Sequence, residues 1–176
     1  MTNRSCDLAK LFLGLCAVIF FFTAANAQDK SLTTKTSRNV KTMTKLAKGT
    51  FEVKVTPLAA EENVGDPTIG RLSLDKQFSG DVAGTSKGQM LGLQTETKDS
   101  GGYVAMERVT GTLEGKKGSF ALQHTGTMQG GKFEMNVTVV PDSGTGELAG
   151  ISGKMKIIIE VGKHFYEFEY SLARPK

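Results

Sequence analysis

The stretch ERVTGTLEGKKGSFALQHTGTMQGGKF, residues 107–133, decides the fold of this 176-residue chain. Apolar and polar side chains alternate along it, and the alternation is interrupted at 114–117 and at Gly130–Gly131. Alternation with a period of two is typical of strands that bury one face, and glycine-containing interruptions are typical of tight turns. The stretch therefore predicts three antiparallel strands joined by two short turns.

The same alternation continues on both sides of this stretch. Phe51, Val53 and Val55 are separated by charged residues, and beyond the N-terminal segment no long run carries the 3.6-residue apolar period of an amphipathic helix. Glycine is abundant, at 21 residues, and supplies the turns. Eight strands are predicted, at 50–57, 68–78, 83–94, 102–113, 118–129, 132–140, 147–161 and 164–172.

Three turns predict the pairing of these strands, because a turn of given length fixes the register of its hairpin. We expect a four-residue loop at 114–117, a two-residue turn at Gly130–Gly131 and a last turn at Gly162–Lys163. All three registers place apolar residues opposite apolar residues on one face. The expected pairs include Gly111 with Phe120, Glu107 with His124, Gly126 with Met135, and Ile157 with Phe168.

Eight strands with one apolar face predict an all-β fold, a single eight-stranded antiparallel up-and-down closed barrel of lipocalin-like architecture, because closure removes exposed strand edges. A two-sheet sandwich is the alternative. Such a barrel is either filled by side chains or holds one small ligand. Gly111 and Gly126 are expected to leave room inside. The glycine-rich run at 143–153 is interpreted as a bulged or bent beginning of the seventh strand.

The N-terminal segment reads as a targeting signal. Arg4 and Lys10 precede an apolar run at 11–22, and a small-residue site ends at Ala27. Twelve apolar residues are too few for a membrane span, which needs about 20. We therefore predict a signal peptide at 1–27 that is cleaved after Ala27, no stable membrane insertion afterwards, and a periplasmic or secreted location.

A basic segment at 28–48 follows, with six basic residues against Asp29, whereas residues 49–176 carry fourteen basic and sixteen acidic residues. We interpret 28–48 as a poorly ordered spacer and 49–176 as the barrel domain. The alternative, contact of the basic segment with anionic lipid or nucleic acid, lacks a supporting motif, so no nucleic-acid partner is predicted. The sequence leaves open whether the chain forms a homo-oligomer.

The sequence offers few residues for a thiol-based reaction or a metal site. Cys6 and Cys16 both lie in the predicted signal, so the mature chain is expected to have no thiol. His124 and His164 with scattered carboxylates do not show metal-ligand spacing, and His164, beside the last turn, is expected to face solvent. No cofactor motif occurs, so we predict neither a metal nor a cofactor.

Glu107 and His124 are ionisable residues that the predicted register places on the otherwise apolar inner face. An ionisable pair there is costly unless its members satisfy each other. One interpretation is a structural pair that fixes the register. The other is a histidine oriented by a carboxylate, available as a general acid or base or as a hydrogen-bonding partner of a ligand. The expected ligand-lining residues on the same face are Tyr103, Phe120, Met135, Tyr166 and Phe168.

Several blocks also resemble a known family. GTFEVK (49–54), FSGDVAGTSKG (78–88), GSFALQHTG (118–126), SGTGELAG (143–150) and HFYEFEY (164–170) resemble a bacterial domain-of-unknown-function family of small β-barrels, which is classed alongside the plant allene oxide cyclase barrel. The resemblance covers nearly all of 49–176 and implies the barrel fold. It implies no reaction, because no motif here corresponds to the site of that cyclase and a shared barrel does not transfer chemistry.

Three functions are compatible with these observations. The first is an exported barrel that binds a small, mostly apolar molecule inside. The second is an isomerase or cyclase in which Glu107 and His124 transfer protons. The third is an envelope interaction protein with a filled, structural barrel. The sequence does not decide whether the protein is an enzyme.

Overall fold

The computed structural model describes residues 43–60 and 64–173. The predicted signal peptide with its cleavage site, and residues 28–42 of the predicted basic segment, lie outside the described residues. The described part of the chain contains no helix long and apolar enough to cross a membrane.

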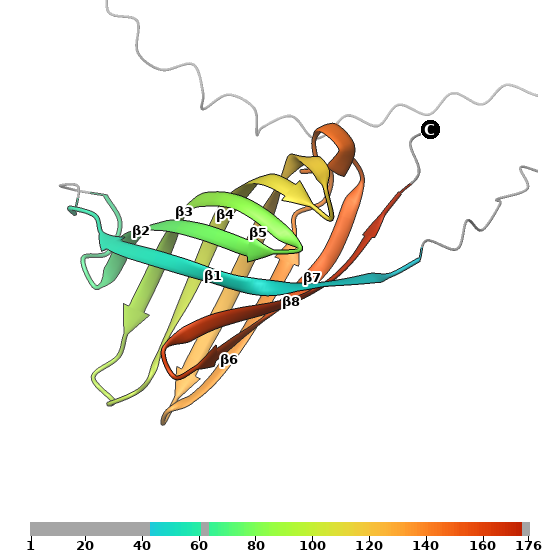
Figure 1. The fold of residues 1–176 in the computed structure, drawn as a ribbon. Helices are drawn as coiled ribbons and strands as arrows, with labels where there is room; N and C mark the ends of the chain where they lie inside the picture. The colour runs from blue at the N-terminus through green and yellow to red at the C-terminus, as the bar shows by residue number, and fades with distance from the viewer. Residues whose placement is uncertain (1–42, 61–63, 174–176) are drawn as a thin grey trace, which may run out of the picture. The chain divides into compact units, whose positions relative to one another are not determined.

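The described residues form a closed antiparallel barrel in which the eight strands are neighbours in chain order (Figure 1). This confirms the predicted barrel and excludes the sandwich. Five of the seven connections are turns of one to six residues, which bring a strand back beside its predecessor. The strands are β1 (Lys45–Pro57), β2 (Ile69–Gly80), β3 (Val82–Gln94), β4 (Gly101–Leu113), β5 (Lys116–Gln129), β6 (Lys132–Val139), β7 (Ile151–Glu160) and β8 (Lys163–Leu172).

Two strand boundaries differ from the prediction by more than two residues. β1 begins at Lys45 rather than at residue 50, because Lys45 to Lys48 continue the ladder against β8. β7 begins at Ile151 rather than at residue 147, because Gly146–Leu148 form a short 3-10 helix, η1. The glycine-rich run is thus a cap with a buried Leu148, not a bent part of the strand.

Two of the three predicted registers are wrong by two residues. The β4–β5 turn is the pair Glu114–Gly115 and the β7–β8 turn is Val161–Gly162, and all four residues have positive φ. Two-residue hairpin turns require positive φ, which glutamate and valine seldom adopt, so the sequence did not indicate these turns. A shift of two keeps every side chain on its face, and the predicted inner face is therefore right. The Gly130–Gly131 turn and its register are confirmed.

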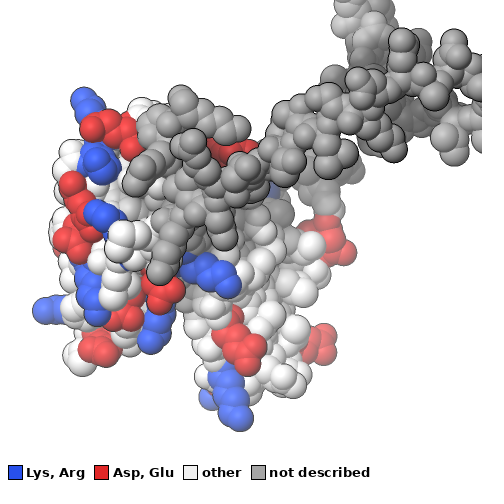
Figure 2. Space-filling model, turned by 90° about the vertical axis from the view of Figure 1, so that its right-hand side faces the viewer, with Lys and Arg blue, Asp and Glu red and all other residues white. Residues whose placement is uncertain are grey.

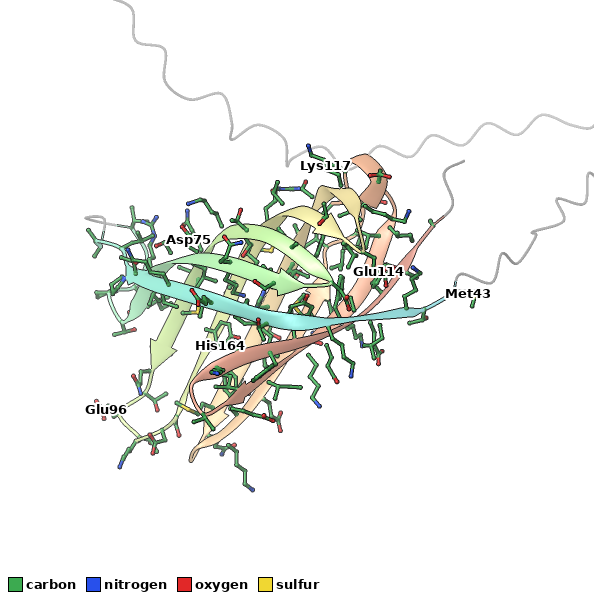
Figure 3. The ribbon with its side chains drawn as sticks, viewed as in Figure 1. Met43, Asp75, Glu96, Glu114, Lys117 and His164 are labelled. Atoms are coloured by element: carbon green, nitrogen blue, oxygen red, sulfur yellow. The ribbon has the colours of Figure 1, made fainter. Side chains whose placement is uncertain are left out.

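The interior is densely packed at one end, which we call the closed end. Three aromatic rings stack there in a row: Phe120 lies 5.5 Å from Phe168, and Phe168 lies 5.4 Å from Tyr170, between ring centroids. Leu148 of η1 is buried against the same cluster. Glu114 and Lys117 mark this end in Figure 3, and Glu96 and His164 mark the opposite end.

The space expected beside two glycines is occupied. A side chain at Gly126 would place its Cβ 2.2 Å from the ring of Tyr103, which lies across this glycine. At Gly111 a Cβ would come within 2.8 Å of the Cα of Gly84 on the neighbouring strand. These glycines therefore allow a ring and a backbone to approach closely, and leave no cavity.

The barrel wall has the fewest ladder pairs where β6 meets β7, which share the single pair Thr138 with Lys154, and it is also unpaired along part of the seam between β1 and β8. β1 and β8 pair only from Lys45 with Tyr170 to Phe51 with His164, and beyond Phe51 β1 pairs with β2 alone. Figure 1 shows β1 parting from β8 at this point. A hollow of about 550 Å³, lined by residues 50–53 and 162–165, lies at this part of the wall.

Two tyrosines of the closed end offer a matched test of packing. The Tyr170 hydroxyl is buried and interacts with the Lys45 and Glu114 side chains without a hydrogen bond of full geometry, whereas the Tyr166 hydroxyl accepts a hydrogen bond from the Val82 N–H at 2.8 Å. A buried polar group without a partner costs about 1 to 3 kcal/mol. We therefore expect Tyr166→Phe, which leaves the Val82 N–H without its acceptor, to lower the free energy of unfolding by about 1 kcal/mol, and Tyr170→Phe to change it by less than about 0.5 kcal/mol.

Urea unfolding of the two variants, followed by circular dichroism, checks this expectation. Equal destabilisation by both substitutions would show that the Tyr170 hydroxyl makes a full hydrogen bond in solution.

Candidate ligand-binding site

Four polar side chains meet inside the barrel, and all are buried. Glu107 is 2% exposed, His124 3%, Lys76 5% and Ser86 1%. One oxygen of Glu107, Oε1, accepts hydrogen bonds from Lys76 Nζ at 2.7 Å and from His124 Nε2 at 2.8 Å. The other, Oε2, accepts a hydrogen bond from Ser86 Oγ at 2.5 Å. We call these four residues the polar cluster.

The four adjacent strands β2, β3, β4 and β5 each contribute one residue to the polar cluster. Lys76 of β2 pairs directly with Ser86 of β3. Gly88 is opposite Glu107 of β4, and a Cβ at Gly88 would lie 2.6 Å from the Cβ of Glu107. The glycine therefore makes room for the glutamate. His124 projects inward from the next strand, β5.

The predicted direct pairing of Glu107 with His124 is wrong. Glu107 lies opposite Leu122, and His124 lies opposite Ala105, because the β4–β5 turn is shorter than expected. The two residues are diagonal neighbours on the inner face, a spacing that long side chains can bridge. They meet through Oε1 and Nε2, so the predicted contact exists at a different register.

Opposing effects set the charge of Glu107. Burial is the largest single effect and by itself would raise the pKa, but the hydrogen bond from His124 and the positive charge of Lys76 together outweigh it. The pKa of Glu107 is thereby lowered from 4.5 to about 2. Burial, with the charge of Glu107 as a smaller effect, raises the pKa of Tyr103. Glu107 is therefore an ionised carboxylate at neutral pH.

The lowered pKa predicts a loss of stability in acid. A carboxyl group whose pKa is lower in the folded protein stabilises the fold above its unfolded pKa, and this contribution is lost as the pH falls toward the folded value. For Glu107 the window runs from 4.5 down to about 2. We expect about 2 kcal/mol of the free energy of unfolding to be lost between about pH 6 and pH 3 through this group.

Urea unfolding at the two pH values measures this loss. Other carboxyl groups also titrate there, so the control is a variant with Lys76→Met and Glu107→Gln together, which should lose about 2 kcal/mol less than the natural chain. Identical acid sensitivity of the two proteins would contradict the assignment.

Beyond the polar cluster the barrel is hollow, and we call this hollow the cup. A cavity of about 170 Å³ lies over Lys76 and His124. A wider hollow of about 390 Å³ shares Met90, Tyr103 and Phe133 with it. The other side chains lining the inner cavity are mostly apolar: Phe51, Val53, Val55, Leu74, Met135, Ile157, Ile159 and His164.

Large apolar side chains of the cup face inward and are nevertheless exposed. Val55 is 45% exposed, Phe133 48% and Ile159 58%. Their counterparts at the closed end are fully packed. The interior is therefore filled at one end and open at the other.

The predicted lining residues divide between these two ends. Tyr103 and Met135 line the cup. Phe120, Tyr166 and Phe168 are 1% exposed or less and belong to the packed core. The residue alternation that placed all five inside could not show which end of the barrel each would reach.

Three polar residues of the interior were missed or misplaced by sequence reasoning. Lys76 occupies an apolar position of its strand, between Leu74 and Phe78, and this signal was available. Ser86 gave no signal, because serine fits either face. His164 was expected to face solvent, but it is half-buried and stacks on Phe51 with 5.0 Å between ring centroids, which places it at the cup wall.

A second apolar surface lies outside the barrel. Leu91, Val104 and Met106 of β3 and β4 are each about half exposed and line an outer hollow of about 400 Å³. In the face drawn in Figure 2, acidic and basic side chains are interspersed rather than gathered by sign. An apolar probe thus has two surfaces available, the cup and this outer apolar surface, and a binding experiment has to distinguish between them.

Among residues 43–60 and 64–173, no group of three or more histidine, cysteine, aspartate or glutamate side chains could hold a metal ion. The polar cluster contains one carboxylate, one imidazole and one ammonium group, and the ammonium charge opposes a cation. The groups present are able to form hydrogen bonds and to exchange protons.

Comparison with known proteins agrees with this architecture. The sequence profile of a family described as "Protein of unknown function (DUF3224)" matches residues 47–170. The chain belongs to the DUF3224 family. A crystal structure of a DUF3224 protein of unknown function from Shewanella oneidensis MR-1 is 44% identical, and the match covers 76% of this chain and 100% of that one with a TM-score of 0.70. No curated protein matches.

Membership in DUF3224 confirms the predicted resemblance to a family of unknown function. The relation to the allene oxide cyclase barrel stays a prediction. The function of this DUF3224 barrel therefore has to be argued from the cup and its polar cluster.

Proposed function

We propose that this DUF3224 barrel binds a small, mostly apolar molecule in the cup. The observation that carries the proposal is the asymmetry of the interior. A barrel that needed only stability would pack its whole length, because buried apolar area stabilises by about 25 cal/mol per Å². Here Val55, Phe133 and Ile159 face inward and stay exposed.

The dimensions and chemistry of the cup support this function. Small-molecule sites are typically concave and mostly apolar, with few polar groups, and have volumes of roughly 300 to 1,000 Å³. The wider hollow of the cup, about 390 Å³, falls in this range, and the inner cavity adds the polar cluster at its floor. The gap between β1 and β8, beside Phe51 and His164, offers a second path for a ligand.

A titration with N-phenyl-1-naphthylamine, a neutral apolar dye whose fluorescence rises on binding, tests the proposal. We expect saturable binding of one dye per chain. Leu91→Gln with Val104→Thr, on the outer apolar surface, should leave this binding unchanged. Dye binding that is absent, or that disappears in this outer-surface variant, would contradict the proposal.

A second candidate function is an isomerase or cyclase, and the orientation of His124 favours it. Its Nε2–H is held by the Glu107 carboxylate, so a neutral imidazole presents Nδ1 as a base. In this function Nδ1 takes a proton from a carbon beside a carbonyl group and returns it elsewhere. Exchange of the α-hydrogens of 2-decanone in deuterated water, measured by NMR, should be faster with the natural chain than with His124→Leu.

A further inference from the structure

The polar cluster allows the class of ligand to be named. Glu107 has little capacity left for a ligand, because three of its about four acceptor sites are used by Lys76, Ser86 and His124, and its side chain is 0% exposed. Lys76 has its charge matched by Glu107, and its Nζ also lies 4.8 Å from the centroid of the Phe51 ring.

His124 is the member with an unused ring nitrogen, whereas Lys76 keeps N–H donors beyond the one bound to Glu107. His124 Nε2 donates to Glu107, and Nδ1 makes no hydrogen bond to any residue in the described part of the chain. Among the described residues, the fully buried side-chain atom without a hydrogen-bond partner is the Tyr170 hydroxyl oxygen. Nδ1 of His124 also lacks a partner but is not fully buried, so it is accessible from a cavity. His124 lines both the inner cavity and the hollow outside the barrel, and because its side chain meets Glu107 inside the barrel, we place the unused atom within reach of a ligand in the inner cavity.

The charge of the cluster restricts the head group further. Lys76 and the ionised Glu107 cancel, so the floor is neutral when His124 is neutral. A carboxylate placed there would bring an uncompensated negative charge into a buried site, which is costly. A hydroxyl group can donate to Nδ1 without bringing any charge.

We propose that the ligand is a neutral apolar molecule with a hydroxyl group, which donates a hydrogen bond to Nδ1 of His124. The apolar body of the ligand lies against Met90, Tyr103 and Met135 in the cup. This inference rests on the proposed function and adds the head group to it. No proton leaves the ligand in this binding mode.

Displacement of N-phenyl-1-naphthylamine by three competitors tests the inference. The competitors are 1-decanol, nonyl methyl ether and decanoate. The ether has as many heavy atoms as the alcohol but no donor, and it leaves Nδ1 unpaired. We expect the alcohol to displace the dye at a concentration at least about tenfold lower than the ether, and decanoate at about pH 8 to be the weakest competitor.

Two variants assign the discrimination to His124. His124→Leu removes the acceptor, and the alcohol-to-ether ratio should fall to about one. His124→Gln can still donate to Glu107 and offers a carbonyl oxygen to the ligand, so it should retain most of the ratio. If His124→Leu does not fold, the alcohol-to-ether displacement ratio, measured in the natural chain and in His124→Gln, still tests whether the ligand needs a hydroxyl group.

Three outcomes would overturn the inference. Equal displacement by the alcohol and the ether would show that the ligand needs no hydroxyl group and that the cup binds apolar molecules without one. Decanoate as the strongest competitor would identify an acidic ligand instead. Failure of the dye itself to bind would overturn the proposed function and this inference together.

Discussion

Replacing Glu107 by glutamine is expected to lower the free energy of unfolding by about 3 to 5 kcal/mol. The substitution keeps the shape of the side chain but removes its charge and replaces one acceptor oxygen with an NH2 donor. Lys76, 5% exposed, is then left as a buried ammonium group without a counterion. A typical domain is stable by only about 5 to 15 kcal/mol, so this variant should unfold at much lower urea concentration.

The double variant Lys76→Met with Glu107→Gln is the matched control. It removes both charges, and methionine fills much of the volume of lysine, so most of the lost stability should return. Additive losses in the two single variants and the double variant would show that Lys76 and Glu107 do not form a buried pair in solution.

Filling the cup is expected to abolish ligand binding while the fold persists. Gly92 faces the cup, and a Cβ added there would meet no heavy atom closer than 3.8 Å, from Gly102 and Tyr103. Gly92→Phe can therefore extend its ring into the hollow of about 390 Å³. We expect the affinity for N-phenyl-1-naphthylamine to fall at least about tenfold, because the ring takes the volume that the dye requires.

The control for this variant is Thr85→Phe, on the same strand but on the outer face, where the side chain is exposed. Both variants should unfold within about 1 kcal/mol of the natural chain, and only Gly92→Phe should lose dye binding. Undiminished binding in Gly92→Phe would place the ligand outside the cup.

The barrel was predictable from sequence because its signals are redundant. Alternation in each strand, glycine at the turns and agreement among three hairpins all indicated one buried face. The exact registers were not predictable, because two turns place Glu114 and Val161 at positive φ, where these residues are rare. The error was a multiple of two, and for that reason it left the faces intact.

The candidate site was predictable only in part. Glu107 and His124 stood out as ionisable residues at inner positions, and the structure brings them into contact. Lys76 had the same signal and was missed, although it supplies the countercharge that lowers the pKa of Glu107. The hollow itself had no sequence signal, because whether inner side chains fill a barrel depends on how they pack across it, and alternation does not describe that packing.

The most direct test of the account is an NMR titration of the protein with methyl-labelled methionine. Five methionines report on different places. Met90, Met128 and Met135 line the cup or its mouth, Met106 lies on the outer apolar surface, and Met155 is buried in the closed-end core.

Addition of 1-decanol should shift the methyl signals of Met90, Met128 and Met135 in a saturable manner and leave those of Met106 and Met155 in place. A shift confined to Met106 would show that the outer surface, and not the cup, binds apolar molecules, and would contradict the account.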